Sequence, residues 1–66
     1  MESRHLLVPD GLDGTRADAA LAKMLGFSRT FAGEVLEAGG ARMDGRALVK
    51  SDRLRGGAWL DIEWAA

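Results

Sequence analysis

Two short clusters of this sequence place an arginine beside hydroxyl or carboxylate side chains where a helix is expected to begin. They are Gly14-Thr15-Arg16-Ala17-Asp18 and Ser28-Arg29-Thr30. The first backbone N–H groups of a helix have no partner within the helix, and the helix dipole favours a negative charge there. Arginines and hydroxyls beside these groups suit a phosphate, so the clusters predict an anion site. The alternative is structural, with Ser28 as a helix cap and Arg29 in solvent.

A third cluster is a tight turn, Asp44-Gly45, with basic side chains around it. Asp-Gly between two short apolar segments is a strong signal for a β-hairpin. Arg42, Arg46 and Lys50 lie on both sides of this turn and could follow a nucleic-acid backbone. Charged residues near a turn are also common in proteins that bind no nucleic acid, so both interpretations stay open.

Asp18 is expected to cap the first helix and to orient a nearby arginine. One carboxylate without a second acid, a metal ligand or a pocket makes no case for acid–base catalysis, so no catalytic residue is predicted. Arg16 and Lys23 are seven residues apart, which places them on one exposed face of that helix.

The charge of the chain limits what it can bind. Nine Lys and Arg against ten Asp and Glu give a net charge of -1, whereas strong nucleic-acid binders are commonly basic. From Arg42 to Arg55, however, five basic residues stand against two acids, which predicts a local basic surface. Cysteine is absent, which excludes disulfides and thiolate metal sites, and no metal or organic cofactor is predicted.

Length and hydropathy predict one soluble domain over residues 1–66. A chain of this size has room for a thin core but not for a second domain. The N-terminus lacks the apolar run of a signal peptide, and no segment has the roughly 18 apolar residues of a membrane span. We therefore expect a cytoplasmic location and no membrane partner.

Apolar spacing predicts two short helices separated by a link of two or three residues. The first is expected to begin with Thr15 as N-cap, with Asp18 completing a capping-box pair, and to end at Gly26. The second is expected to begin at Ser28 and to end at Gly39-Gly40. Their apolar positions are Ala17, Ala20, Leu21, Met24 and Leu25 in the first helix, and Phe31, Ala32, Val35, Leu36 and Ala38 in the second. So short a link predicts that the helices pack as a tight corner.

The remaining segments predict strands. Residues 6–8 form a short apolar run closed by Pro9, which is typical of an edge strand. Residues 40–43 and 46–49 flank the Asp-Gly turn, and residues 58–64 alternate apolar and polar side chains. The predicted fold is α+β, with the two helices packed as a helix-turn-helix-like pair against a small, mainly antiparallel sheet.

Trp59 is expected to point away from the core, together with Asp61 and Glu63. An exposed tryptophan can stack on a nucleobase. The acidic neighbours would repel phosphate, so we favour packing of Trp59 against the N-terminal strand or against another domain.

Taken in order, these motifs resemble the S-four-type RNA-binding domain, a helix pair packed on a small sheet. The resemblance runs from residue 12 to residue 64 and involves Gly14, Arg16, Asp18, Leu21, Ser28, Arg29, Gly39, Met43-Asp44-Gly45-Arg46 and Lys50, followed by a glycine before the last strand. The segment Val8-Pro9-Asp10 ahead of Gly14 is similar to the start of ribosomal large-subunit pseudouridine synthases. In that family this domain precedes a separate catalytic domain, which carries the catalytic aspartate and which we expect to lie outside these residues.

The resemblance implies a module that binds structured ribosomal RNA and performs no chemistry itself, within an enzyme that isomerises uridine to pseudouridine without a cofactor. No DNA partner is expected. The resemblance implies that the residues facing the RNA are Arg16, Asp18, Ser28, Arg29, Thr30, Asp44 and Lys50. Three more basic residues complete the candidate RNA-binding set, namely Lys23, Arg42 and Arg46. We expect the fold to bring the two helix openings and the hairpin turn onto one basic face.

Three positions depart from the family pattern. Phe31 and Glu34 stand where Arg or Lys is common, and Asp44 replaces a common Asn. Each departure lowers the positive charge, which predicts modest affinity for RNA. Two alternatives stay open. The parent could be a ribosome-associated protein, an RNA methyltransferase or a tRNA synthetase, or the domain could be a protein-interaction module that has lost RNA binding.

Overall fold

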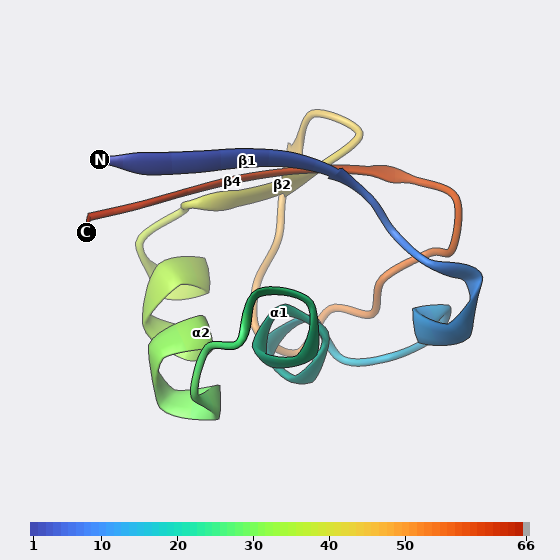
Figure 1. Ribbon diagram of the computed structural model, residues 1–66, viewed down its shortest axis with the longest axis horizontal. Coiled ribbons are helices and arrows are strands. Elements are labelled where there is room, and N and C mark those ends of the chain that lie inside the picture. Colours follow the sequence, from blue (N-terminus) through green and yellow to red (C-terminus); the bar gives the residue numbers. More distant parts are fainter. Residues whose placement is uncertain (66) are drawn as a thin grey trace.

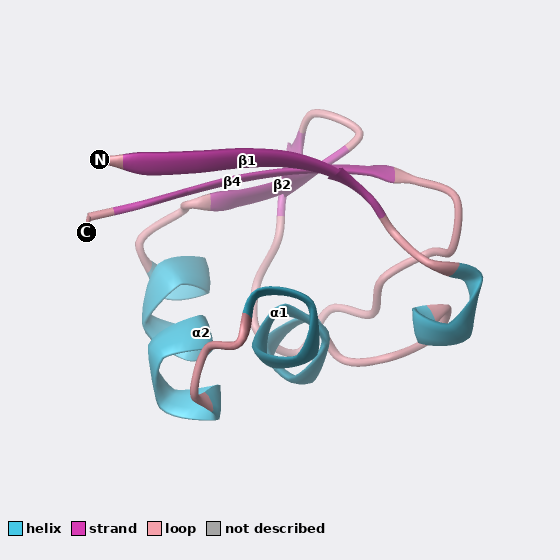
Figure 2. Ribbon diagram, in the orientation of Figure 1, coloured by secondary structure: helices cyan, strands magenta, loops and turns pink. Residues whose placement is uncertain are grey.

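The computed structural model describes residues 1–65 and has an α+β fold, as the sequence predicts. Two α-helices lie against a four-stranded antiparallel sheet (Figures 1 and 2). The elements in chain order are β1 (Glu2–Leu7), a short 3-10 helix η1 (Asp10–Leu12), α1 (Ala17–Leu25), α2 (Arg29–Glu37), β2 (Ala41–Met43), β3 (Arg46–Ala47) and β4 (Trp59–Trp64). Neither α-helix in this part of the chain is long and apolar enough to span a membrane.

The last strand of the chain lies inside the sheet. The strand order is β1-β4-β2-β3, and β4 pairs with β1 along its whole length, from Glu2 opposite Trp64 to Leu7 opposite Trp59. β1 is an edge strand, as predicted, but it begins at Glu2 rather than at Leu6. The first half of the strand is polar, so no apolar run marks it in the sequence. Pairing with β4 extends the strand to Glu2.

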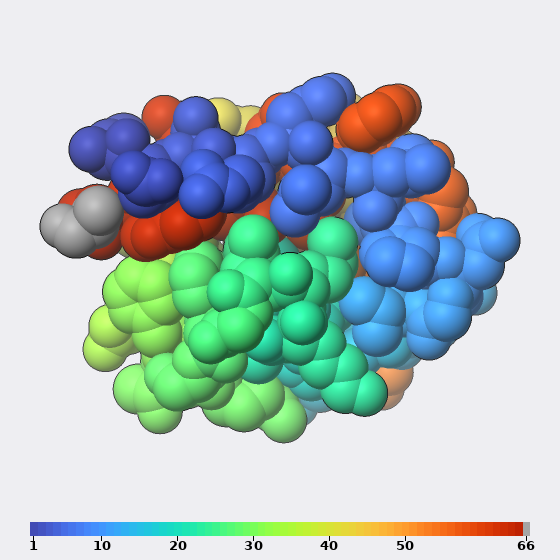
Figure 3. Space-filling view, in the orientation of Figure 1, coloured from blue at the N-terminus to red at the C-terminus, as the bar shows by residue number. Residues whose placement is uncertain are grey.

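Alternation along β4 gives the sheet two different faces. Leu60 and Ile62 are buried, whereas Trp59, Asp61 and Glu63 are exposed on the other side, as predicted. Both helices lie on one side of the sheet in Figure 1, and their atoms pack against β1 and β4 in Figure 3. The core consists of Val8, Ala17, Ala20, Leu21, Ala32, Val35, Leu36, Ala41, Met43, Leu48, Leu54, Ala58, Leu60 and Ile62.

Helix α1 begins differently from the prediction. Thr15 is not its N-cap, because that position is taken by Arg16, whose side chain caps no N–H group. The N–H of Ala17 donates instead to the carbonyl of Asp52 (2.7 Å). A segment distant in the sequence thus supplies an acceptor that a capping box would have provided. The predicted apolar stripe and the end at Gly26 are confirmed.

Helix α2 begins as predicted, with Ser28 as its N-cap. The Ser28 hydroxyl accepts a hydrogen bond from the N–H of Phe31 (3.0 Å) and so satisfies one of the free donors of the helix. Residues 26–28 alone separate the two helices, which form the predicted corner (Figure 1). The predicted burial of Ala38 is wrong, because the helix ends at Glu37 and Ala38 is the exposed C-cap residue.

The predicted hairpin between β2 and β3 is confirmed, but its second strand is short. Asp44 and Gly45 both have positive φ (50° and 84°), which is the backbone of the tight turns that join twisted strands. Glycine adopts this conformation freely, and aspartate tolerates it better than most residues. β3 then contains only Arg46 and Ala47, and the next side chain, Leu48, is buried in the core.

Candidate nucleic-acid interface

A buried carboxylate joins the openings of the two helices. Asp18, in the first turn of α1, has a side chain that is only 10% exposed. Its Oδ1 accepts hydrogen bonds from the N–H of Ala19 (2.8 Å) and from Nε of Arg16 (3.3 Å). Its Oδ2 lies 3.2 Å from Nη2 of Arg16 and 3.4 Å from Nη2 of Arg29. One acid therefore pairs with an arginine from each helix opening, where a single nearby arginine was expected.

The same contacts set the ionisation of Asp18. Burial by itself raises the pKa of the carboxyl group, because the charged form loses its water. The Ala19 N–H and the guanidinium groups of Arg29 and Arg16 stabilise the charged form by more, so the pKa lies below its ordinary value. Asp18 is consequently an anion at neutral pH and orients both arginines.

The helix corner explains how Arg29 reaches Asp18. Because Ser28 is the cap, Arg29 is the first residue of α2. The two helices pack directly on each other after a link of only three residues, which brings the start of α2 within reach of the acid near the start of α1. The side chains of Arg16 and Arg29 remain 46% and 61% exposed, which leaves N–H groups on both available to a ligand.

An open groove of about 640 Å³ lies beside this cluster, a size within the usual range of ligand clefts. Lys50, from the loop after β3, lies at the groove with its Nζ 3.2 Å from Oε1 of Glu37. The lining residues are Asp18, Arg29, Thr30, Gly33, Glu34, Glu37 and Lys50. The groove thus combines two cations with three acids, which corrects the expectation of a basic face. Within residues 1–65, no three acidic or histidine side chains gather as metal ligands would.

One arginine near the cluster was not among the predicted residues. The backbone of Arg53 pairs with that of Arg16 in a single antiparallel β-bridge, outside the four strands. The Nη1 group of the Arg53 side chain donates a hydrogen bond to the carbonyl of Gly14 (2.7 Å). These contacts place a third arginine at the opening of α1. No motif marks Arg53, and the only signal in the sequence is its position in the basic stretch 42–55.

Arg42 does not line the groove. The prediction that it shares one basic face with the two helix openings is therefore wrong. It lies between the buried residues Ala41 and Met43 on β2. Because side chains alternate along a strand, Arg42 points to the face of the sheet opposite the helices. Its partner in register on β4 is Asp61, which is exposed on that same face.

The hairpin turn also lies apart from the helix openings. Asp44 forms an ion pair with Arg55, and Arg46 lies opposite Met43 on the outermost strand. In Figure 1 the turn between β2 and β3 projects from the sheet on the side away from both helices.

Lys23 lies in the last turn of α1, at the other end of the helix from Asp18. The structure thus brings together Arg16, Asp18, Arg29, Thr30 and Lys50, with Ser28 as the cap of α2.

The similar proteins are all of one kind. The chain is 47% identical over 62 residues to uncharacterized RNA pseudouridine synthases of Mycobacterium bovis and Mycobacterium tuberculosis. It is 38% identical over 61 residues to ribosomal large subunit pseudouridine synthase D of Xanthomonas campestris. These alignments cover 94% and 91% of this chain but 20% and 18% of the relatives, so the chain spans about a fifth of their length. No protein-family model matches it.

Proposed function

We propose that this chain is an S-four-type RNA-binding domain that positions the catalytic domain of a pseudouridine synthase on structured ribosomal RNA. The observation that carries the proposal is the Asp18 cluster, in which one buried acid orients Arg16 and Arg29 from two helix openings. Planar guanidinium groups held in a fixed orientation lose little freedom when they bind phosphate. The similarity to RNA pseudouridine synthases supports this choice of ligand and of parent enzyme.

Binding of this kind depends on shape and on phosphate contacts. The major groove of A-form RNA is too deep and narrow for side chains to read, so proteins mostly contact phosphates and the 2′-hydroxyls of the shallow minor groove. The groove adds Lys50 and the Thr30 hydroxyl to the two arginines, whereas Glu34 and Glu37 oppose phosphate. We therefore expect weak binding by the isolated chain, with a dissociation constant of about micromolar at low salt.

The chain itself supplies no chemistry under this proposal. Its clustered carboxylate, Asp18, is committed to two arginines and a backbone N–H, so it is not available to act on a substrate. The isomerisation of uridine to pseudouridine would take place in a separate catalytic domain. The role of these residues is to bring that domain to its RNA.

The main test measures the affinity of the chain for a structured RNA hairpin as a function of salt. Arg29→Ala should weaken binding by about 1 to 3 kcal/mol and reduce the salt slope by about 0.7 to 0.9. Arg46→Ala is the matched control, because Arg46 is an exposed arginine on β3 and lies outside the groove. Unchanged affinity in a folded Arg29→Ala variant would contradict the proposal.

Asp18→Asn gives a second test, because two possible roles of Asp18 predict opposite changes in RNA affinity. If the charge of Asp18 only opposed phosphate, its removal would tighten RNA binding. If Asp18 orients Arg16 and Arg29, the variant should bind RNA about three- to tenfold more weakly, because the arginines lose their fixed orientation. Fluorescence anisotropy at one salt concentration measures the sign, and thermal melting shows that the variant is folded.

A protein-interaction module is the second candidate, favoured by the net charge of -1 and by the acids of the groove. Such a module should show no salt-sensitive NMR shifts at Arg16, Arg29 and Lys50 when structured RNA is added at millimolar concentration. Shifts at these residues that disappear at high salt support RNA binding instead.

A further inference from the structure

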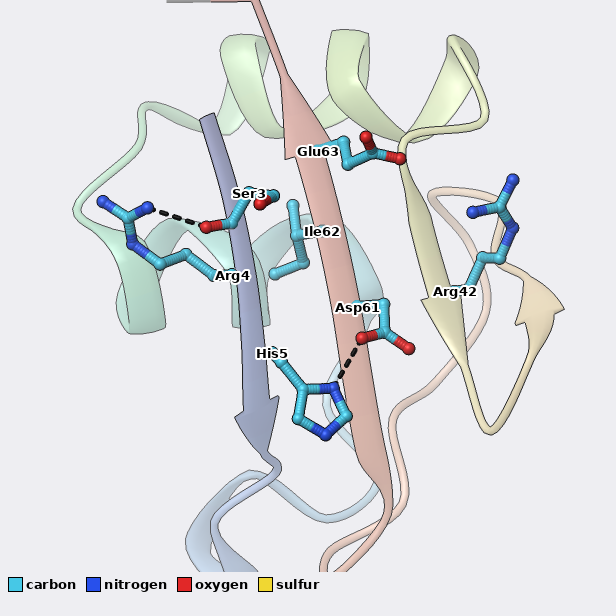
Figure 4. Close-up of a pocket in the computed structure, with 7 residues that line it drawn as sticks. All are labelled: Ser3, Arg4, His5, Arg42, Asp61, Ile62 and Glu63. Carbon is cyan, nitrogen blue, oxygen red and sulfur yellow. Dashed lines mark hydrogen bonds and ion pairs between the residues drawn. The ribbon is translucent and has the colours of Figure 1, made fainter. Parts of the chain in front are cut away.

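The face of the sheet opposite the helices carries a second group of side chains. Asp61 is central on this face, because the register of the sheet places His5 of β1 on one side of it and Arg42 of β2 on the other. Figure 4 shows these side chains on three adjacent strands. Within residues 1–65, both α-helices lie on the other face of the sheet (Figure 2). The side chains around Asp61 are therefore accessible.

An aromatic stack adjoins this row of residues. The rings of His5 and Trp59 are parallel to within 3°, and their centroids are 4.5 Å apart. Each ring covers one face of the other, yet Trp59 is 48% exposed and the His5 side chain is 61% exposed. Trp59 thus packs against the N-terminal strand, as predicted, but the outer part of the stack remains in solvent. It offers a flat apolar surface to a third ring.

Two of the acids on or beside this face have a side-chain partner, whereas no ion pair forms at Glu63 within residues 1–65. Oδ1 of Asp61 lies 2.5 Å from Nδ1 of His5, and Asp44 forms an ion pair with Arg55. Asp44 also accepts a hydrogen bond from the N–H of Trp59 (3.2 Å), which places this second pair at the start of β4. Arg55 offsets the charge of Asp44, but the described residues of this face have no positive excess, so the expected repulsion of phosphate remains. A ligand of this face should bind through a ring rather than through phosphate.

A groove of about 370 Å³ lies beside the stack. His5, Arg42, Asp61 and Glu63 are among its lining residues (Figure 4). Arg42 donates hydrogen bonds, and the two carboxylates accept them. These are the partners that the polar edge of a nucleobase requires. The face thus combines a stacking surface with hydrogen-bonding groups beside it.

We propose that this face binds an unpaired nucleobase of the RNA, stacked on His5 and Trp59 with its polar edge toward Arg42 and Asp61. The inference rests on the proposed function for the identity of the partner, and it adds a single-stranded contact to the phosphate contacts of the helix groove. Every base has a π face, so such stacking tolerates different sequences and needs little positive charge. The two contacts should therefore differ in their dependence on salt.

The test compares three RNA hairpins that share one stem. One is blunt, one has two unpaired nucleotides at each end, and one has abasic residues in place of those nucleotides. The wild-type chain should bind the unpaired flanks at least about fivefold more tightly than the abasic flanks, which have the same phosphates but no bases. Trp59→Leu should remove this difference and leave the salt slope unchanged. Val49→Ala, at another exposed apolar side chain, is the matched control.

Two further variants separate this inference from the proposed function. Arg29→Ala should lower the salt slope and keep the difference between the flanks, because it changes only the helix groove. His5→Ser removes the ring that β1 contributes to the stack, so it should also abolish the difference between the flanks. This variant serves as the test if Trp59→Leu fails to fold. Thermal unfolding identifies the folded variants.

Equal binding of the unpaired and abasic flanks by the wild-type chain overturns the inference, and so does a flank difference that persists in both stack variants. The proposed function is then still supported if the chain binds the blunt hairpin in a salt-dependent way. If the blunt hairpin does not bind, a single-stranded oligonucleotide decides the question. A shift of the Trp59 indole N–H resonance on its addition supports the base site alone, and no shift overturns it.

Discussion

The helix groove and the open face of the sheet each contain a central aspartate with a basic partner, but the two carboxylates lie in different environments. Asp18 is 10% exposed and pairs with two arginines and a backbone N–H, whereas Asp61 is 53% exposed and pairs with His5. Water cannot replace a lost partner of a buried acid, but it readily solvates an exposed one. Asp18 therefore fixes the geometry around it, whereas losing the partner of Asp61 costs little.

The two regions also offer different groups to a ligand. Around Asp18 these are the N–H donors of arginine side chains, which suit phosphate. Around Asp61 the aromatic rings of His5 and Trp59 are exposed, and they suit a nucleobase. A folded RNA has phosphates throughout and free bases wherever a strand is unpaired. The two proposed contacts are therefore compatible with one ligand.

The largest effect is expected at Gly40, which joins α2 to β2 and so connects the two regions. A Cβ atom at this position would lie 2.4 Å from the carbonyl oxygen of Glu63, closer than two such atoms can approach. Gly40→Ala should lower the free energy of unfolding by about 3 kcal/mol and disturb both regions together. Urea unfolding and NMR shifts on both faces measure this.

Gly33→Ala is the control for that substitution. Nothing lies within 4 Å of a Cβ atom at Gly33, which is inside α2, so alanine should raise the stability by about 0.5 to 1 kcal/mol. A Gly40→Ala variant as stable as the wild type would show that the contact between residue 40 and β4 is not fixed.

A smaller effect should distinguish the two aspartates directly. Asp18→Asn should lower the free energy of unfolding by about 1 to 2 kcal/mol, because a buried acid loses its charge-assisted hydrogen bonds. Asp61→Asn should change it by less than about 0.5 kcal/mol, since the exposed pair with His5 contributes little. Equal losses in the two variants, measured by urea unfolding at neutral pH, would contradict the comparison.

Acidification should remove the contribution of Asp18. Its pKa is lowered in the folded state from the ordinary value of 3.8, so the folded state binds fewer protons than the unfolded state between the two values. The stabilisation is present in full above the ordinary pKa and is lost as the pH falls through the folded pKa. The stability difference between wild type and Asp18→Asn should therefore shrink from pH 7 to about pH 2. A difference that stays constant over this range would assign the effect of the substitution to packing.

The smallest effect is expected from the charge of the groove. Glu34→Lys should tighten binding of the RNA hairpin about threefold and make it more sensitive to salt, because it adds a cation to a surface that meets phosphate. Asp10→Lys makes the same change of charge in η1, outside the groove, and should have less effect. Equal gains in both variants would mean that net charge rather than the groove sets the affinity.

Short-range preferences allowed much of the fold to be predicted from the sequence. The Ser28 cap, the Asp44-Gly45 turn and the alternation along residues 58–64 each involve neighbours along the chain, and each is present in the structure. The same preferences marked Asp18 and Arg29 as residues at helix openings. Their placement at one site could not be predicted, because the sequence does not state how the two helices cross and which side chains then meet.

The sequence by itself thus determined the two helices, the Ser28 cap and the hairpin turn, whereas the tertiary structure decided how α1 begins and which distant groups meet. The Asp52 carbonyl replaces Thr15 as the partner of the first helical N–H, the pairing of β2 with β4 turns Arg42 away from the groove, and Asp18 bridges two helices. The physical reason is that a turn or a cap is stabilised within a few residues. A buried ion cluster is stabilised only after the core has removed water from the acid and brought its partners within hydrogen-bonding distance.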